Sequence, residues 1–130
     1  MDAIPAAHRR AVQEAVAKFR DDVHRAGAAS VIDHARDVAS AALSGYLQNL
    51  GLVRPGRELA ELIEVLSNLQ GDQKKHVAVS TAEIVRIFHS RAKPSVQERL
   101  VFRSVHEQDA RLAISCVGTL LCELGWAEWR

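Results

Sequence analysis

The stretch Ser104–Gly125, SVHEQDARLAISCVGTLLCELG, decides the fold that this sequence predicts. Ser104 and Glu107 have the spacing of a capping box, in which two side chains bind free amides at the start of a helix. Gly125 suits the left-handed residue that ends a helix, which brings Trp126 back onto Leu121. Between these ends, apolar residues recur at the three- and four-residue steps of one helical face. They are Ala110, Ala113, Ile114, Val117, Leu120, Leu121 and Leu124. The pattern predicts one long helix that closes the chain.

The predicted closing helix also carries apolar or small side chains away from its main stripe. Leu112 and Cys116 add apolar surface on other faces, so we expect this helix to be central, with little of its second half facing water. Ser115, Gly118 and Cys122 form a stripe of small residues. The segment Ala39–Gly45, ASAALSG, is also almost all small residues. We therefore expect these two small faces to cross closely, with Gly118 at the crossing.

Four further amphipathic segments precede the closing helix. We expect helices from near Pro5 to Ala26, from Ser30 to Leu50, from about Arg57 to Gln70, and from Ser80 to just before Pro94. Each ends before a Gly or a Pro, the residues that most often stop helices. The segment 72–79 is predicted to be a polar loop, and 95–103 is either a loop with a helical turn or an extended segment. Five helices with short connections predict a single all-α domain over residues 1–130, a five-helix bundle.

Composition excludes several classes of function. The 130 residues carry a formal net charge of +1, so no global field favours nucleic acid or an anionic membrane. No run of about eighteen apolar residues predicts a membrane span. The first ten residues lack the basic and apolar regions of a secretory signal. We expect a cytoplasmic protein in which Cys116 and Cys122 stay reduced.

Helical bundles often hold metal ions between their helices. Three Asp/His pairs have the i,i+3 spacing of one helical face: Asp21 with His24, His34 with Asp37, and His106 with Asp109. A carboxylate-bridged dimetal site also needs inward-facing Glu residues, and the third predicted helix offers none. There is no HExxH sequence either. We expect no metal site and no cofactor.

Three stretches resemble a known family. VIDHARDVASAALSGYLQNLG (31–51), EIVRIFHSRAK (83–93) and HEQDARLAISCVGTLLCEL (106–124) look like the C-terminal helical domain of abortive-infection proteins. That domain is similar to the HEPN superfamily of helical, usually dimeric nucleotide-binding or ribonuclease domains. The resemblance spans roughly residues 30 to 125. It implies a HEPN-like homodimer that acts in phage defence or in a toxin–antitoxin system.

The same resemblance suggests candidate catalytic residues. In the family, an Arg-Asn pair after the penultimate helix is followed within a few residues by a His. Arg91 matches the Arg, but Ala92 stands in place of the Asn and Gln97 in place of the His. A looser HEPN pattern, an Arg and a His separated by four to six residues, is met by Arg99 and His106. In metal-independent RNA cleavage such a His moves a proton and the Arg stabilises charge on the phosphoryl group.

The departures at positions 92 and 97 favour a non-catalytic module that binds protein or RNA. An active endoribonuclease using Arg99 and His106 is the alternative. A helical transcriptional regulator is the third reading, because 80–103 offers a capped helix, a proline break and a basic second segment. Any RNA contact should centre on the start of the closing helix, where free amides receive phosphate and Arg91 and Arg103 bind it.

Overall fold

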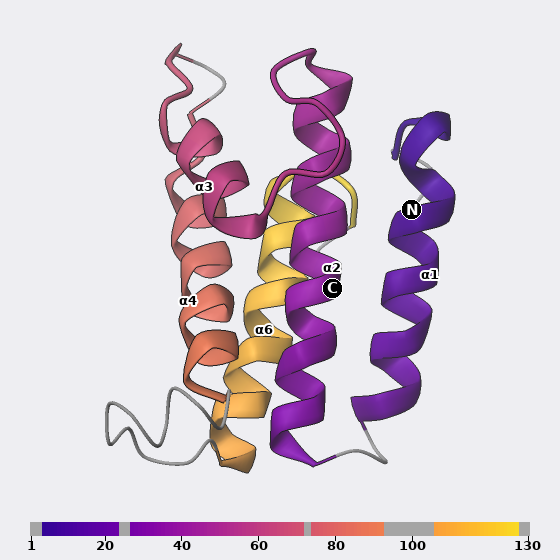
Figure 1. The fold of residues 1–130 in the computed structure, drawn as a ribbon, viewed down its shortest axis with the longest axis vertical. Coiled ribbons are helices and arrows are strands. Elements are labelled where there is room, and N and C mark those ends of the chain that lie inside the picture. Colours follow the sequence, from indigo (N-terminus) through magenta and orange to yellow (C-terminus); the bar gives the residue numbers. More distant parts are fainter. Residues whose placement is uncertain (1–3, 24–26, 72–73, 93–105, 128–130) are drawn as a thin grey trace.

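The computed structural model describes residues 4–23, 27–71, 74–92 and 106–127. Every regular element among them is a helix, and the predicted all-α fold with five helices is confirmed for this part of the chain (Figure 1). The helices are α1 (Ala6–Val23), α2 (Ala28–Asn49), α3 (Leu59–Ser67), α4 (His76–Ala92) and α6 (Glu107–Glu123). The long helices α1, α2, α4 and α6 run alternately down and up, as in an up-and-down bundle (Figure 1).

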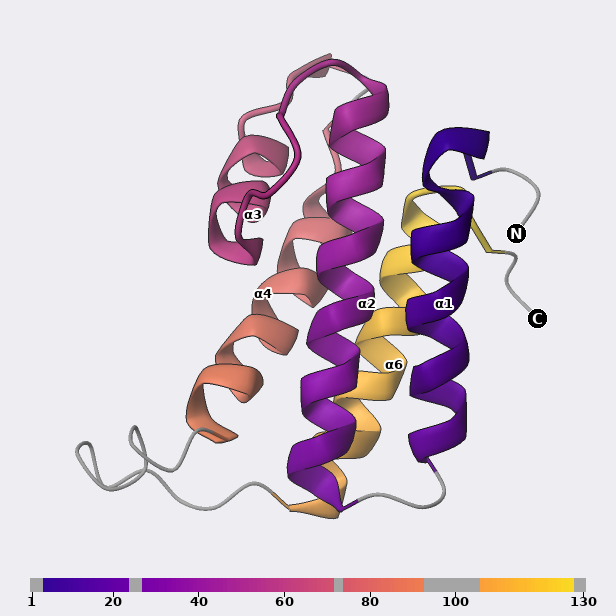
Figure 2. The same cartoon turned by 45° about the vertical axis from the view of Figure 1, so that its right-hand side comes forward.

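The central helix is α2, so the expectation that the closing helix occupies the centre was wrong. Helix α2 packs against α1, α3, α4 and α6, whereas α6 packs against α2 and α4 (Figure 2). Buried residues lie on several sides of α2: Val31, Ile32, Ala35, Val38, Ala39, Ala42, Leu43, Gly45 and Leu47. Helix α1 packs on α2 and makes no backbone contact with α6 in the described part of the chain. Helix α6 faces α1 across a groove that is lined by side chains of both helices.

Two predicted helix ends are confirmed. Gly51 has a φ of 73°, and the amide of Leu52 donates to the carbonyl of Leu47 at 3.0 Å. Gly125 has a φ of 76°, and the amide of Trp126 donates to the carbonyl of Leu121 at 2.9 Å. Both are the hydrogen bonds of a Schellman motif, in which a left-handed residue lets the chain cover the last carbonyls.

The start of α1 at Ala6 agrees with the predicted start near Pro5, whereas the predicted starts of α2 and α4 were wrong. Helix α2 begins at Ala28 after Gly27, and α4 begins at His76, four residues before Ser80. Ala78 and Ala82 are both fully buried, one helical turn apart. Burying both on one core-facing side requires the helix to continue through Ser80. Tertiary packing therefore extends α4 beyond the capping-box sequence.

The predicted crossing at Gly118 was also wrong. Gly118 is exposed, and a Cβ atom built on it meets no atom within 4 Å. The close approach on the small face of α2 is instead at Gly45, where a Cβ would lie 2.9 Å from the Cβ of His8 and 3.3 Å from the ring of Trp126. Residue size predicted a close contact for α2 correctly but assigned it to the wrong neighbour.

Lys75, which belongs to the predicted polar loop 72–79, contributes to the packing at one end of the bundle. The ammonium of Lys75 donates to the carbonyl of Glu123 at 3.0 Å and lies 6.0 Å from the ring centroid of Tyr46. That ring meets buried Trp126 edge-on, with centroids 6.0 Å apart. Lys75 thus links the start of α4 to α2 and to the end of α6.

Candidate functional site

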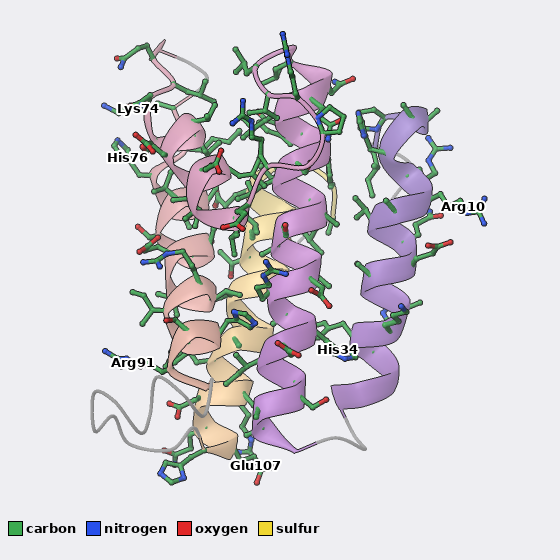
Figure 3. All side chains as sticks on the ribbon, viewed as in Figure 1. Arg10, His34, Lys74, His76, Arg91 and Glu107 are labelled. Atoms are coloured by element: carbon green, nitrogen blue, oxygen red, sulfur yellow. The ribbon has the colours of Figure 1, made fainter. Side chains whose placement is uncertain are left out.

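The predicted site lies where α4 ends and α6 begins. Figure 3 shows Arg91 and Glu107 at the same end of the bundle. Arg91 is half-buried in the last turn of α4, and His106 is exposed as the N-cap residue of α6. The other two predicted residues, Arg99 and Arg103, lie outside the described residues. The structure therefore places two of the four predicted site residues at one end of the molecule.

The start of α6 is capped two residues later than the sequence predicted. The backbone N–H of His106 donates to the carboxylate of Asp109 at 2.9 Å, and Asp109 is 8% exposed. Glu107, predicted as the capping carboxylate, pairs with Arg111 at 3.3 Å instead. A carboxylate in the first turn stabilises the positive end of a helix.

The same arrangement weakens the predicted phosphate site. A helix start attracts anions because its first amides have no partner within the helix. Here the carboxylate of Asp109 already binds one amide at this end and brings a negative charge to it. A phosphate would meet repulsion from that charge and from Glu107. The chemistry at the start of α6 suits a stable helix end better than the binding of RNA.

Cations on the neighbouring helices are paired with carboxylates. Arg86 makes two hydrogen bonds to Glu83 on α4. Their contact holds the pKa of Glu83 below its ordinary value and raises the pKa of Arg86, in both cases chiefly through the hydrogen bonding. His89 on α4 contacts Asp33 on α2 at 2.8 Å. These pairings leave the α4 surface near Arg91 with little net positive charge.

The described residues contain no cluster of three or more His, Cys, Asp or Glu side chains that could hold a metal ion. Of the three Asp/His pairs, Asp21 with His24 lies outside the described side chains. Asp109 binds the backbone of His106. Among the described helices, none has the length and apolar character needed to cross a membrane.

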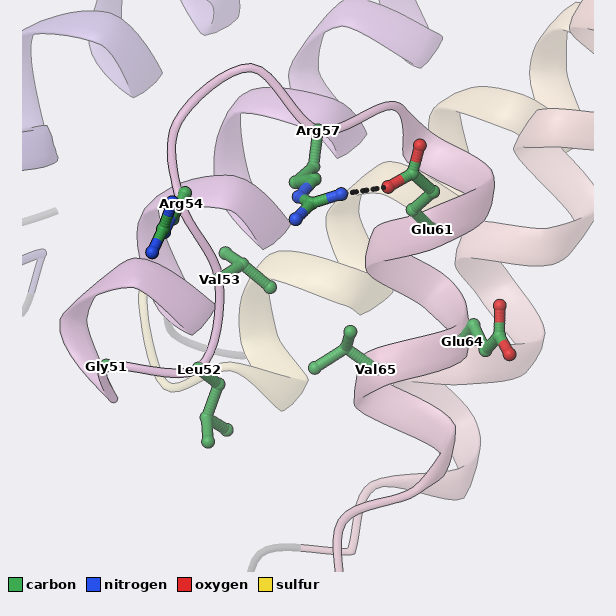
Figure 4. A pocket seen from close by; sticks show the side chains of 8 residues that line it. All are labelled: Gly51, Leu52, Val53, Arg54, Arg57, Glu61, Glu64 and Val65. Atoms are coloured by element: carbon green, nitrogen blue, oxygen red, sulfur yellow. Dashed lines mark hydrogen bonds and ion pairs between the residues drawn. The ribbon is translucent and has the colours of Figure 1, made fainter.

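Hollows open on the surface of the described bundle. One, of about 450 Å³, lies between the 51–57 loop and α3 (Figure 4). Arg54 and Arg57 line it together with Glu61 and Glu64, and Arg57 pairs with Glu61 at 3.0 Å. Because two cations face two carboxylates, the charges around this hollow select no particular ligand.

A second hollow, of about 480 Å³, is a groove between α1 and α6. Its walls are apolar and come from both helices: Val16, Phe19, Ile114, Val117 and Leu121. Gly118 and Arg20 complete the lining. Sequence reasoning missed this groove because its two walls lie about a hundred residues apart in the chain.

Beside the groove, the solvent-facing side of α6 lacks charge after Arg111. We call Leu112, Ser115, Thr119 and Cys122 the outer face of α6. Leu112 is 46% exposed, Ser115 is exposed, and the other two are half-buried. No charged residue occurs from position 112 to position 122, whereas the exposed face of a surface helix usually carries charged residues. The uncharged run was visible in the sequence, but it was interpreted there as internal packing.

Searches of protein-family models, curated proteins and solved structures gave no match to this chain.

Proposed function

We propose that this chain is a non-catalytic helical module of the abortive-infection and HEPN type, which forms a homodimer and binds a partner protein in phage defence or in a toxin–antitoxin system. The observation that carries the proposal is the uncharged outer face of α6. Such a face costs little to remove from water, because no charge has to be desolvated. It therefore suits contact with another protein surface.

The chemistry of the outer face agrees with a protein interface. Charged residues are depleted at the cores of such interfaces, and Leu112 offers an exposed aliphatic side chain there. Ser115 lies in the middle of the face. In a homodimer whose two-fold axis passes near Ser115, the outer face of one copy packs against the outer face of the other. Small side chains at Ser115 and Thr119 permit close approach of two helices.

Symmetric cross-linking tests this arrangement. In a background with Cys116→Ser and Cys122→Ser, Ser115→Cys should form an intermolecular disulfide rapidly on mild oxidation, because a two-fold axis brings equivalent side chains together. The matched control is Gln13→Cys, which is also at an exposed position, on α1. Equal, slow cross-linking of the two variants would contradict a dimer built on the outer face.

One observation favours the rival function, a metal-independent endoribonuclease. His106 is exposed as the N-cap residue of α6, so its imidazole is open to solvent and is of the type that moves a proton in RNA cleavage. Incubation with RNA in the presence of a chelator separates the two functions. The binding module leaves RNA intact, whereas the enzyme cleaves it and loses nearly all cleavage on His106→Ala.

A further inference from the structure

We infer that the groove between α1 and α6 is a binding site for a medium-chain fatty acid, with the carboxylate at Arg20 and the acyl chain between the two helices. The inference goes beyond the proposed function and does not depend on it. Its starting point is the size and lining of the groove, about 480 Å³ with five apolar side chains as walls. Small-molecule sites are typically of this volume and mostly apolar, with a few polar groups that orient the ligand.

Gly118 supports a ligand at this place. A glycine in the middle of a helix costs about 1 kcal/mol relative to alanine. Gly118 is not among the glycines with positive φ, and no side chain approaches it as His8 approaches Gly45. Packing within the described chain therefore gives no reason for glycine here. Because Gly118 lines the groove, any larger side chain would narrow the space that an acyl chain occupies.

Arg20 supplies the charge that selects an anionic head group. It lines the groove, is exposed, and forms no ion pair with a carboxylate in the described part of the chain. Figures 1 and 2 show that α1 and α6 run in opposite directions. Arg20, near the end of α1, therefore lies toward Ile114 at one end of the groove. A guanidinium there can bind a carboxylate with two parallel hydrogen bonds.

The dimensions favour an acyl chain over a protein helix. From Ile114 to Leu121, the wall on α6 is about 10 Å long at 1.5 Å per residue. Spread over that length, the volume of the groove corresponds to a width of about 7 Å, which is less than the 10–12 Å diameter of a helix with side chains. An extended chain of about eight carbons spans a similar length, given C–C bonds of about 1.5 Å. The groove therefore fits an acid of about eight to ten carbons.

The test is a titration of the full chain with sodium decanoate, in which calorimetry and ligand-observed NMR measure binding. The comparison ligand is decyltrimethylammonium, which has the same tail and the opposite charge. Wild-type protein should bind decanoate at least about tenfold more tightly. Arg20→Glu should reverse this preference, and Gly118→Phe should weaken binding of both ligands at least about tenfold by filling the groove. Matched controls are Lys18→Glu and Ala17→Phe, exposed positions of α1 outside the groove.

Three results would overturn the inference. One is no binding of decanoate up to about 10 mM, a concentration that detects even very weak sites. The second is unchanged binding by Gly118→Phe with its helix content intact. The third is a head-group preference that Arg20→Glu leaves unaltered. Repeating the titration with Leu112→Arg separates this inference from the proposed dimer, because Leu112 does not line the groove.

Discussion

The imidazole Nε2 of His89 on α4 lies 2.8 Å from the carboxylate Oδ1 of Asp33 on α2. The ring is 19% exposed and the carboxylate 66%, so the contact sits at the edge of the helix pair. This contact joins α4 to the central helix α2. A hydrogen bond in such a position contributes about 1 kcal/mol to stability.

Asp33→Ala should lower the free energy of unfolding by about 1 kcal/mol, because the partly buried imidazole loses its partner. Urea denaturation followed by circular dichroism measures the change. Asp37→Ala is the matched control, since Asp37 pairs only with its neighbour Arg36 at the surface among the described ion pairs. If the free energy of unfolding falls by the same amount in both variants, the His89–Asp33 contact has no special role in holding α4 on α2.

Gly45→Ala and Gly118→Ala should change stability in opposite directions. A Cβ at position 45 would come 2.9 Å from the Cβ of His8, and relieving that contact costs about 1–3 kcal/mol, more than the gain in helix propensity. At position 118 the new Cβ meets nothing within 4 Å, so stability should rise by about 1 kcal/mol. Thermal melting distinguishes the two. A loss of stability in Gly118→Ala would mean that α6 is packed differently.

Acid should weaken the Glu83–Arg86 pair. The hydrogen bonds from Arg86 hold the pKa of Glu83 below its ordinary value of 4.5. A carboxyl with a lowered folded-state pKa stabilises the fold above its unfolded-state pKa, and this contribution is lost as pH falls through the folded-state pKa. Glu83→Gln should therefore be less stable than wild type at pH 7, with the difference shrinking below pH 4.5. Both side chains are more than a third exposed, so we expect a small effect. If the stability difference between wild type and Glu83→Gln stays constant from pH 7 to below pH 4.5, the predicted role of the Glu83–Arg86 pair is wrong.

The two free cysteines should react at different rates. Cys116 is buried, which raises the pKa of its thiol, whereas Cys122 is half-buried. The thiolate is the reactive form, so iodoacetamide at pH 8 should modify Cys122 well before Cys116. Mass spectrometry of Cys122→Ser and Cys116→Ser follows each thiol separately. Faster reaction at Cys116 would mean that α6 exposes a different face.

Much of the fold could be predicted from the sequence, because local signals determine it. The stops at Gly51 and Gly125 need only a left-handed residue and a returning chain. Helix starts depend on packing with other helices. The burial of Ala78 is the reason that α4 begins before its capping sequence at Ser80. The crossing at Gly118 failed because periodicity identifies a helical face without identifying its neighbour.

Less of the candidate site could be predicted. The exposure of His106 agrees with its place at the start of the closing helix, but the carboxylate that caps this helix is Asp109, two residues later than expected. The groove could not be predicted at all, because Phe19 and Val117 come together only through their separate packing on α2. The charge-free run from position 112 was a trace in the sequence of the outer face of α6.

Sedimentation equilibrium of wild-type protein and of Leu112→Arg tests the proposed role of the outer face of α6 most directly. Wild type should have twice the chain mass of 14.3 kDa, and Leu112→Arg should be monomeric with unchanged helix content, because it places a charge in an uncharged interface. Val77→Arg is the matched control, since Val77 is 48% exposed on α4, close to the 46% of Leu112, and it should remain dimeric. A wild-type protein that stays monomeric, or a Leu112→Arg variant that stays dimeric, would contradict the account.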